Sequence, residues 1–266
     1  MPEAVCAGTK VRYDVAGGGE PALLLLPEWC DNRTQFHRLV PLAAQKRRVL
    51  SPDLPGHGAS EAPPGDFGYR ELTAGILAVV AESGAERVVP VAMGHSGWIA
   101  IALRRRLGRD RVPRLVFVDW FLGDPSPALL QNLQALQDPE RWRSARAQLF
   151  SSWLPADAPR VRDAVFRTMS DYAHGMWARE GREVAAAYAR ERAPIAALAA
   201  LAPPTPALHL FAIPRDDAFL AEQDALARKY PWFSARRLPG RTHFPPLETP
   251  QALAAAIEEF VGEGGS

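Results

Sequence analysis

The stretch that decides the fold is Pro90-Val91-Ala92-Met93-Gly94-His95-Ser96-Gly97-Trp98. An apolar run at 87–91 leads into it, and a helical run at 99–107 follows. The sequence therefore predicts a buried strand, a sharp turn and a helix in direct succession, with glycine available where the turn needs a positive φ. The first question about function is whether Ser96, just after this turn, is a nucleophile or an early residue of the helix.

Apolar runs and helical patterns alternate along the rest of the chain. The runs expected to be strands are 11–16, 22–26, 48–51, 115–118, 208–213 and 234–238. The expected helices are 35–44, 72–82, 219–229 and 251–261, and residues 262–266 are expected to fray. Continuous apolar runs suit strands that are buried on both faces of a parallel sheet. The pattern predicts an α/β fold with a mostly parallel central sheet flanked by helices.

An alanine- and arginine-rich region with helical periodicity separates two of the predicted strands. We expect about four short helices there, forming a cap over the active site. The predicted division is a core domain made of 1–123 and 205–266, with a helical cap at 124–204. Of the cap tryptophans Trp142, Trp153 and Trp177, most are expected in the core, but such caps commonly lend an aromatic ring to a ligand pocket.

Composition excludes several classes of function. The 266 residues carry 31 Lys and Arg against 30 Asp and Glu, so no basic surface for nucleic acid is predicted. Cys6 and Cys30 are too few for a disulfide scaffold or a zinc site, which indicates a reduced, cytoplasmic protein. No apolar run has the length of a membrane helix or a signal peptide, so no membrane partner is expected. The oligomeric state is not indicated.

The string Asp53-Leu54-Pro55-Gly56-His57-Gly58-Ala59-Ser60 resembles a turn found throughout the α/β-hydrolase superfamily. Its glycines allow the positive φ of a tight reversal, and we assign His57 a structural role. This resemblance implies that Gly94-His95-Ser96 is the nucleophile elbow, although the usual x-Gly does not follow the serine. In the literal hydrolase interpretation Ser96 attacks a carbonyl, His243 is the base, and Asp216 or Asp217 is the orienting acid.

A more specific resemblance covers nearly the full chain. Several segments are similar to bacterial cofactor-independent dioxygenases that cleave 3-hydroxy-4-oxoquinolines, a branch of the α/β-hydrolase fold. The matching segments are Leu23-Leu24-Leu25-Leu26-Pro27-Glu28-Trp29-Cys30, Pro90-Val91, Gly97-Trp98, Val118-Asp119-Trp120, Asp138-Pro139-Glu140-Arg141-Trp142-Arg143, Pro231-Trp232-Phe233-Ser234 and Thr242-His243-Phe244-Pro245.

The resemblance implies that His243 is the base and Asp119 its partner carboxylate, in place of Asp216. It implies oxyanion N–H groups at Trp29 and His95, and a substrate-lining tryptophan at Trp153. It also implies that the substrates are a small aromatic heterocycle and O₂, that CO is released, and that no cofactor takes part. No phosphate-binding or dinucleotide motif is present, and no cluster with metal-ligand spacing lies near His243, so no metal is expected.

Two departures from the family pattern stand near the turn. The family's elbow serine, which contacts the substrate without being required as a nucleophile, falls on Gly94, and Ser96 falls on a family glycine. The family's glycine after Leu-Pro is Glu28, whose carboxylate either contacts a polar substrate group or faces solvent. We favour Ser96 as an early helix residue; the expected oxyanion and substrate-binding positions are Trp29, Gly94, His95, Ser96 and Trp153.

Alternative functions remain open from the sequence. They are a Ser96 hydrolase, a lyase or cyclase that uses the His243–Asp119 pair, and a non-enzymatic binding module. Retention of both His243 and Asp119 argues against the binding module.

Overall fold

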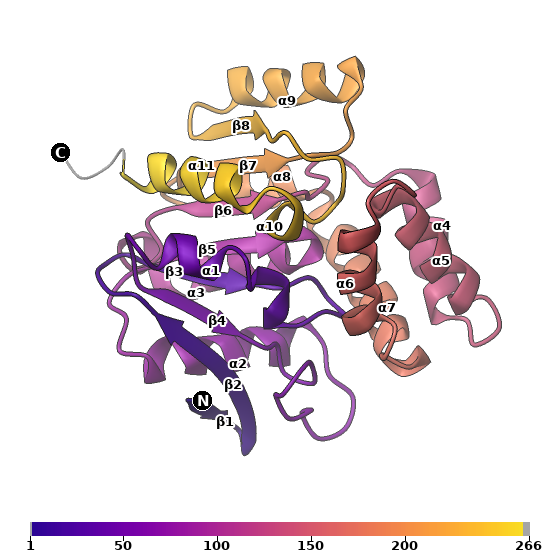
Figure 1. Cartoon of the computed structure of the whole chain (residues 1–266), viewed down its shortest axis with the longest axis horizontal. Helices are drawn as coiled ribbons and strands as arrows, with labels where there is room; N and C mark the ends of the chain where they lie inside the picture. The colour runs from indigo at the N-terminus through magenta and orange to yellow at the C-terminus, as the bar shows by residue number, and fades with distance from the viewer. Residues whose placement is uncertain (1, 263–266) are drawn as a thin grey trace.

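An eight-stranded sheet runs through the centre of the computed structural model, which describes residues 2–262 (Figure 1). The strands are β1 (Glu3–Cys6), β2 (Thr9–Ala16), β3 (Ala22–Leu26), β4 (Val49–Pro52), β5 (Val88–Met93), β6 (Leu115–Val118), β7 (Ala207–Phe211) and β8 (Phe233–Arg237). Their order across the sheet is β1-β2-β4-β3-β5-β6-β7-β8. β2 pairs antiparallel with β1 and β4, and all other neighbours are parallel.

Helices connect the parallel strands and cover both faces of the sheet. Those of the core are η1 (Arg33–Phe36), α1 (Val40–Ala43), α2 (Tyr69–Glu82), η2 (Gly94–Ser96), α3 (Gly97–Arg111), α9 (Asp217–Lys229), α10 (Pro245–Glu248) and α11 (Pro250–Gly262). Helices α1 and α11 contact each other on the near face of Figure 1, and α2 and α3 pack together behind the sheet. The α/β-hydrolase architecture predicted from the sequence is confirmed.

Five helices lie between β6 and β7: α4 (Pro127–Gln137), α5 (Trp142–Trp153), α6 (Pro159–Met169), α7 (His174–Glu191) and α8 (Pro194–Ala199). Helices α4 to α7 gather beyond the carboxyl ends of the parallel strands, at the right of Figure 1. That is the edge at which ligands bind in such sheets. We propose that residues 124–204 act as the cap, with the core on either side of them in the sequence.

The structure differs from the expected elements in a few places. The expected helix at 35–44 is two short pieces, η1 and α1, because Pro41 has no N–H to continue a helix from η1. Strand β1 and helix α10 were not expected, and α2 begins three residues before the expected start at 72. The expected fraying concerns residues that, apart from Gly262, lie outside the described part of the chain.

The register of the parallel strands lines up the loops that follow them. Leu26 pairs with Ala92, so continuing this register by two residues brings Glu28 level with Gly94. Met93 pairs with Val118, which brings Asp119 level with Gly94 on its other side. Three residues far apart in sequence therefore meet at one point on the edge of the sheet.

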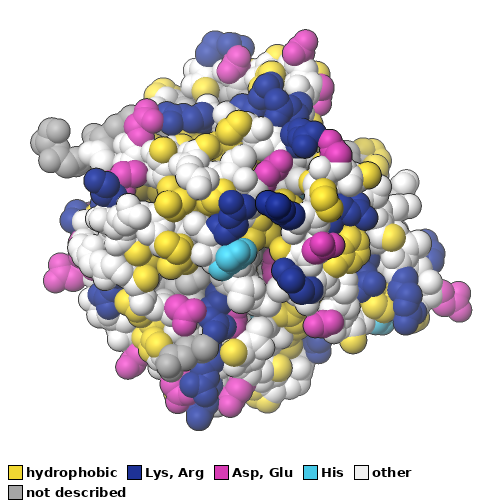
Figure 2. All heavy atoms as spheres, in the orientation of Figure 1, with side chains coloured by type: hydrophobic (Ala, Val, Ile, Leu, Met, Phe, Trp, Pro, Cys, Tyr) yellow, Lys and Arg dark blue, Asp and Glu magenta, His cyan; other side chains and the backbone are white. Residues whose placement is uncertain are grey.

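Basic and acidic side chains are interspersed over the face drawn in Figure 2, in keeping with the formal net charge of +1. Among residues 2–262, no helix is both long and apolar enough to cross a membrane. Cys6 and Cys30 are free thiols.

Candidate active site

A cavity of about 400 Å³ lies between the carboxyl edge of the sheet and the cap. Core loops and cap helices both contribute to its wall. The lining residues are Glu28, Gly94, His95, Asp119, Trp120, Phe121, Leu129, Leu149, Ser152, Trp153, Ile213, Pro214, Phe219 and His243. Most of this wall is apolar, and its polar side chains come chiefly from the strand ends. A mainly apolar pocket with a few convergent polar groups is the usual form of a small-molecule site.

The turn after β5 is a sharp elbow centred on Gly94. Strand β5 runs to Met93, two residues beyond the expected end, and Gly94 follows with φ of +42°. An added Cβ on Gly97 would come within 2.3 Å of the Trp120 ring. Gly97 is therefore the small residue that the start of α3 needs for close packing, and Trp98 packs edge-on against Trp120. The elbow predicted from the sequence is intact.

Ser96 does not face the cavity. It lies in η2, is 2% exposed, and its hydroxyl donates to the carbonyl oxygen of Pro27. This bond ties the elbow to the loop after β3. The position fits an early residue of the helix, and the residues that line the cavity do not include Ser96.

We expect Ser96→Ala to leave kcat/KM within about twofold while lowering the free energy of unfolding by about 1 kcal/mol, the usual net value of one hydrogen bond. Steady-state kinetics and urea unfolding measure the two effects. Loss of turnover together with a covalent acyl adduct on the wild-type protein would support the serine-hydrolase interpretation instead.

Glu28 occupies the expected oxyanion hole. Its Oε1 accepts hydrogen bonds from the backbone N–H groups of Trp29, at 3.1 Å, and His95, at 3.0 Å. The side chain is 1% exposed and its own N–H donates to the Gln35 side chain. Both N–H groups that the resemblance implies as oxyanion donors thus converge on one point, and a carboxylate oxygen of Glu28 lies at it.

Gly94 leaves the space that Glu28 fills. An added Cβ on Gly94 would lie 1.7 Å from Glu28 Oε2, so no larger residue fits at position 94 while the carboxylate stays. The expectation that Glu28 faces solvent is wrong, because the side chain is buried. Its carboxylate lines the cavity among the groups expected to bind the substrate, so contact with a polar substrate group stays a prediction.

His243 lines the same cavity and lies in the loop between β8 and α10. Its backbone N–H donates to the carbonyl oxygen of Trp153 at 3.0 Å, and its ring stacks on the Trp153 ring with centroids 4.8 Å apart. Its Nε2 lies 3.2 Å from Glu28 Oε2. The base candidate is therefore held from the cap side and directed toward the elbow.

We expect Trp153→Ala to lower kcat/KM about tenfold and to cost about 3 kcal/mol of unfolding free energy, because a buried ring is lost and the His243 ring loses its support. Trp153→Phe is the matched control, since it keeps an aromatic surface and the backbone carbonyl. Kinetics and thermal unfolding of both variants test this; equal kinetics for Phe and Ala would show that the ring does not position the base.

Asp119 lies at the carboxyl end of β6 with φ of +47°, a strained conformation for a residue with a Cβ. Its carboxylate accepts hydrogen bonds from the N–H groups of Ala212 and Ile213, at 3.1 Å each for Oδ1. Burial raises the pKa of Asp119 to about 7, although the nearby His243 charge and these bonds act to lower it. Among the ion pairs of the described residues, the His243 ring pairs with Glu28 and not with Asp119.

The other candidate residues have structural roles. Asp216 caps α9 by accepting the Phe219 N–H at 2.9 Å, and it is absent from the cavity wall given above. His57 is fully buried with its Nδ1 3.0 Å from the Pro55 carbonyl, and burial lowers its pKa to about 4. Gly56 and Gly58 have the expected positive φ, at +78° and +52°.

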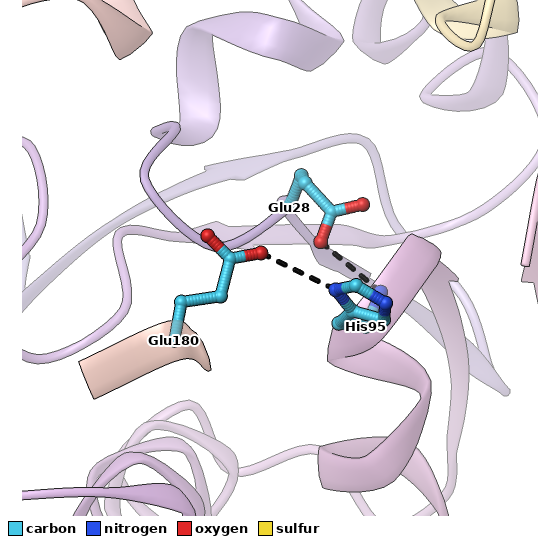
Figure 3. A group of neighbouring side chains, drawn as sticks. All are labelled: Glu28, His95 and Glu180. Atoms are coloured by element: carbon cyan, nitrogen blue, oxygen red, sulfur yellow. Dashed lines mark hydrogen bonds and ion pairs between the residues drawn. The ribbon is translucent and has the colours of Figure 1, made fainter. Parts of the chain in front are cut away.

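Glu180 is a buried residue that sequence reasoning missed. It reaches from α7 to the elbow, where its Oε1 lies 3.2 Å from His95 Nδ1 (Figure 3). Burial raises the pKa of Glu180, while its contact with His95 acts to lower it. Trp177, Gly181 and Val184 share its buried face of α7, so the helical spacing itself indicates that Glu180 points inward.

Glu28, His95 and Glu180 are the group of side chains, within residues 2–262, that can hold a metal ion. One ligand atom from each lies within 4.8 Å of the others. In the arrangement of Figure 3, however, Glu28 Oε1 accepts the His95 N–H and His95 Nδ1 faces Glu180. The N–H groups of Trp29 and His95 both donate to Glu28 Oε1, so this oxygen is already engaged by two backbone donors.

Comparisons with known proteins show the family to which the chain belongs. Residues 22–256 match the model of the alpha/beta hydrolase family. The chain is 36% identical to a 2-heptyl-3-hydroxy-4-quinolone dioxygenase of Rhodococcus erythropolis, over 96% of each chain. It is 33% identical to a 1H-3-hydroxy-4-oxoquinoline 2,4-dioxygenase of Pseudomonas putida, over 96% of this chain and 97% of that one.

A solved structure extends the comparison to three dimensions. It is that of a variant of an enzyme that recognises and cleaves the ring of the Pseudomonas quinolone signal, in complex with its substrate. The two chains superpose with a TM-score of 0.94 at 30% identity, over 99% of each.

Proposed function

Because the chain belongs to the α/β-hydrolase family and, within it, to the quinolone-cleaving 2,4-dioxygenases, we propose that it opens the ring of a 3-hydroxy-4-quinolone-like heteroaromatic with O₂. The observation that supports this most directly is the meeting of His243, Asp119 and two convergent backbone N–H groups in one cavity. That set contains a base, a carboxylate to stabilise its charged form, and donors for a developing oxyanion.

His243 is the proposed base. Its Nε2 is the ring nitrogen that faces the elbow, so it takes the proton of the substrate hydroxyl. Asp119 stabilises the resulting imidazolium across the cavity, and the charge of His243 in turn lowers the pKa of Asp119. The N–H groups of Trp29 and His95 bind the oxygen on which negative charge develops.

The electrons come from the substrate. The deprotonated ring carries its charge on the hydroxyl oxygen and on the adjacent ring carbon, and that carbon bonds to O₂. The peroxide formed then attacks the neighbouring carbonyl carbon. The O–O bond and two C–C bonds then break, which opens the ring. Both oxygen atoms of O₂ stay in the product, one on the carbon that bonded O₂ and one on the former carbonyl carbon. The carbon between these two, which carries the original hydroxyl oxygen, leaves as CO. The proposed sequence uses no metal or flavin.

The size and lining of the cavity suit such a substrate. A volume of about 400 Å³ is ample for a fused bicyclic ring with a side chain, and Trp120, Phe121 and Trp153 offer flat apolar surface. A largely apolar wall also excludes water from the anion that must meet O₂.

Incubation with 3-hydroxy-4-quinolones, with and without a 2-alkyl chain, tests the proposal. The protein, freed of metal by chelation, is expected to consume one O₂ and release one CO per ring opened, and to be inactive under argon. Turnover under argon would identify a non-oxidative lyase or hydrolase. Comparison of the two quinolones shows whether the cavity is adapted to an alkyl chain.

A further inference from the structure

One side chain contacts both proposed oxyanion donors and the proposed base. Glu28 Oε1 accepts from the N–H groups of Trp29 and His95, and Glu28 Oε2 lies 3.2 Å from His243 Nε2. These are the two oxyanion donors and the base. In the ligand-free protein a substrate oxygen therefore finds its donors already bonded to an oxygen of the protein.

We propose that Glu28 is an internal competitor of the substrate and thereby a specificity-determining residue: its carboxylate holds the oxyanion hole and is displaced when the substrate oxygen enters. The nature of the displacing ligand rests on the proposed function, whereas the occupation of the hole does not. Hydrogen bonds to an ionised acceptor are about twice as strong as those to a neutral one. A neutral carbonyl oxygen is thus a poor competitor, and the site selects substrates whose oxygen develops full negative charge.

The surroundings of Glu28 allow this displacement. Within the described part of the chain its ion-pair partner is His243 alone, and no guanidinium or ammonium group anchors it. It is instead surrounded by acidic groups, since its charge adds to the effect of burial in raising the pKa of Glu180 and of Asp31. The cavity beside it offers room for a rotated carboxylate. Repulsion from its neighbours and open space on one side both favour movement of the side chain.

The geometry also explains why Glu28 and Gly94 occur together. Glu28 Oε2 lies where the side chain of residue 94 would begin, at 1.7 Å from an added Cβ. The strand register places the two residues level with each other. The Glu28 side chain therefore fills the volume that the absent side chain of Gly94 leaves empty. The Glu28 carboxylate thus lies in the space that the serine side chain of the family pattern would need at position 94.

Removal of the side chain is the direct test. We expect Glu28→Gly to raise kcat/KM for a 3-hydroxy-4-quinolone at least about tenfold, because the donors no longer have to give up a charge-assisted bond. Glu28→Gln is the matched control: its amide oxygen can still accept both N–H bonds but carries no charge. Its kcat/KM is expected to lie between those of the wild type and the glycine variant.

A binding measurement tests the same inference without turnover. Sodium acetate supplies the carboxylate that Glu28→Gly lacks, so it is expected to raise the melting temperature of that variant and to inhibit it competitively. The wild type is expected to respond to acetate no more than to sodium chloride of equal ionic strength. Should Glu28→Gly fail to fold, Glu28→Gly/Gly94→Ser, which refills the space from the other side of the turn, takes its place in the kinetic comparison.

The outcomes separate the two proposals. A folded Glu28→Gly that turns over more slowly than the wild type would show that Glu28 takes part in the reaction, and would overturn the competitor role. Equal stabilisation of both proteins by acetate would also overturn it. If acetate stabilises only Glu28→Gly while no variant cleaves a quinolone, the competitor role stands and the proposed function fails.

Discussion

Replacement of His243 by alanine is expected to lower kcat/KM about 10³-fold, the usual contribution of a positioned general base. The ring of His243 is the proposed proton acceptor, and its Nε2 points to the oxyanion hole. Without it, the acidic hydroxyl must lose its proton to water in a largely apolar cavity. The residual rate should rise with pH, because hydroxide can then substitute for the imidazole.

The matched control is His37→Ala, since His37 is an exposed histidine outside the cavity wall. It should keep wild-type kinetics and stability. Binding of the quinolone to His243→Ala under argon, followed by absorbance, separates loss of the base from loss of the site. A variant without His243 that retains a tenth of the activity would place the base elsewhere.

Asp119→Asn is expected to produce the second largest loss, about 10²-fold, and to change the pH profile. Burial raises the pKa of Asp119 to about 7, so the carboxyl is protonated at lower pH and no longer stabilises an imidazolium. For the wild type we therefore expect kcat/KM to fall as the pH drops below about 7. The asparagine variant should show a smaller decline, because the titration of Asp119 is removed while His243 must still be unprotonated to act as the base. The pH profiles of both proteins on one substrate will show the difference. An unchanged profile would assign the decline to another group.

The same pKa makes a prediction about stability. The folded state binds the Asp119 proton more tightly than the unfolded state, whose pKa is near 3.8, so the stabilising effect is fully present below that value. It is lost as the pH rises through about 7, by an amount on the order of 4 kcal/mol. Chemical unfolding of wild type and Asp119→Asn between these limits should give free-energy differences that change in this direction.

The fold was predictable because its signals are local. The apolar run before Gly94, the glycines that follow, and the Gly56 and Gly58 turn each specify their own backbone. The expected single helix at 35–44 was wrong. Its apolar spacing is helical, but Pro41 lacks the N–H that a continuous helix would need at that position. Several strands also end one or two residues away from the expected positions. The exact end of a strand depends on its hydrogen bonds with the neighbouring strand, which the local sequence does not show.

The candidate site was predictable only in part, because its main interaction joins residues far apart in sequence. Nothing local to Glu28 says that Gly94 will lie level with it; that follows from the β3–β5 register. A signal was nevertheless present. Glu28 is a charged residue two positions after the buried strand β3, and such a group must find polar partners. The glycine at position 94 and the glutamate on the apolar face of α7 were the matching clues.

The hydrogen bond between the His243 backbone and the Trp153 carbonyl ties the base to the last residue of a cap helix. Any outward swing of α5 that admits a ring must break this bond or carry His243 with it. A displacement of α5 would therefore reach the proposed base through this one backbone contact.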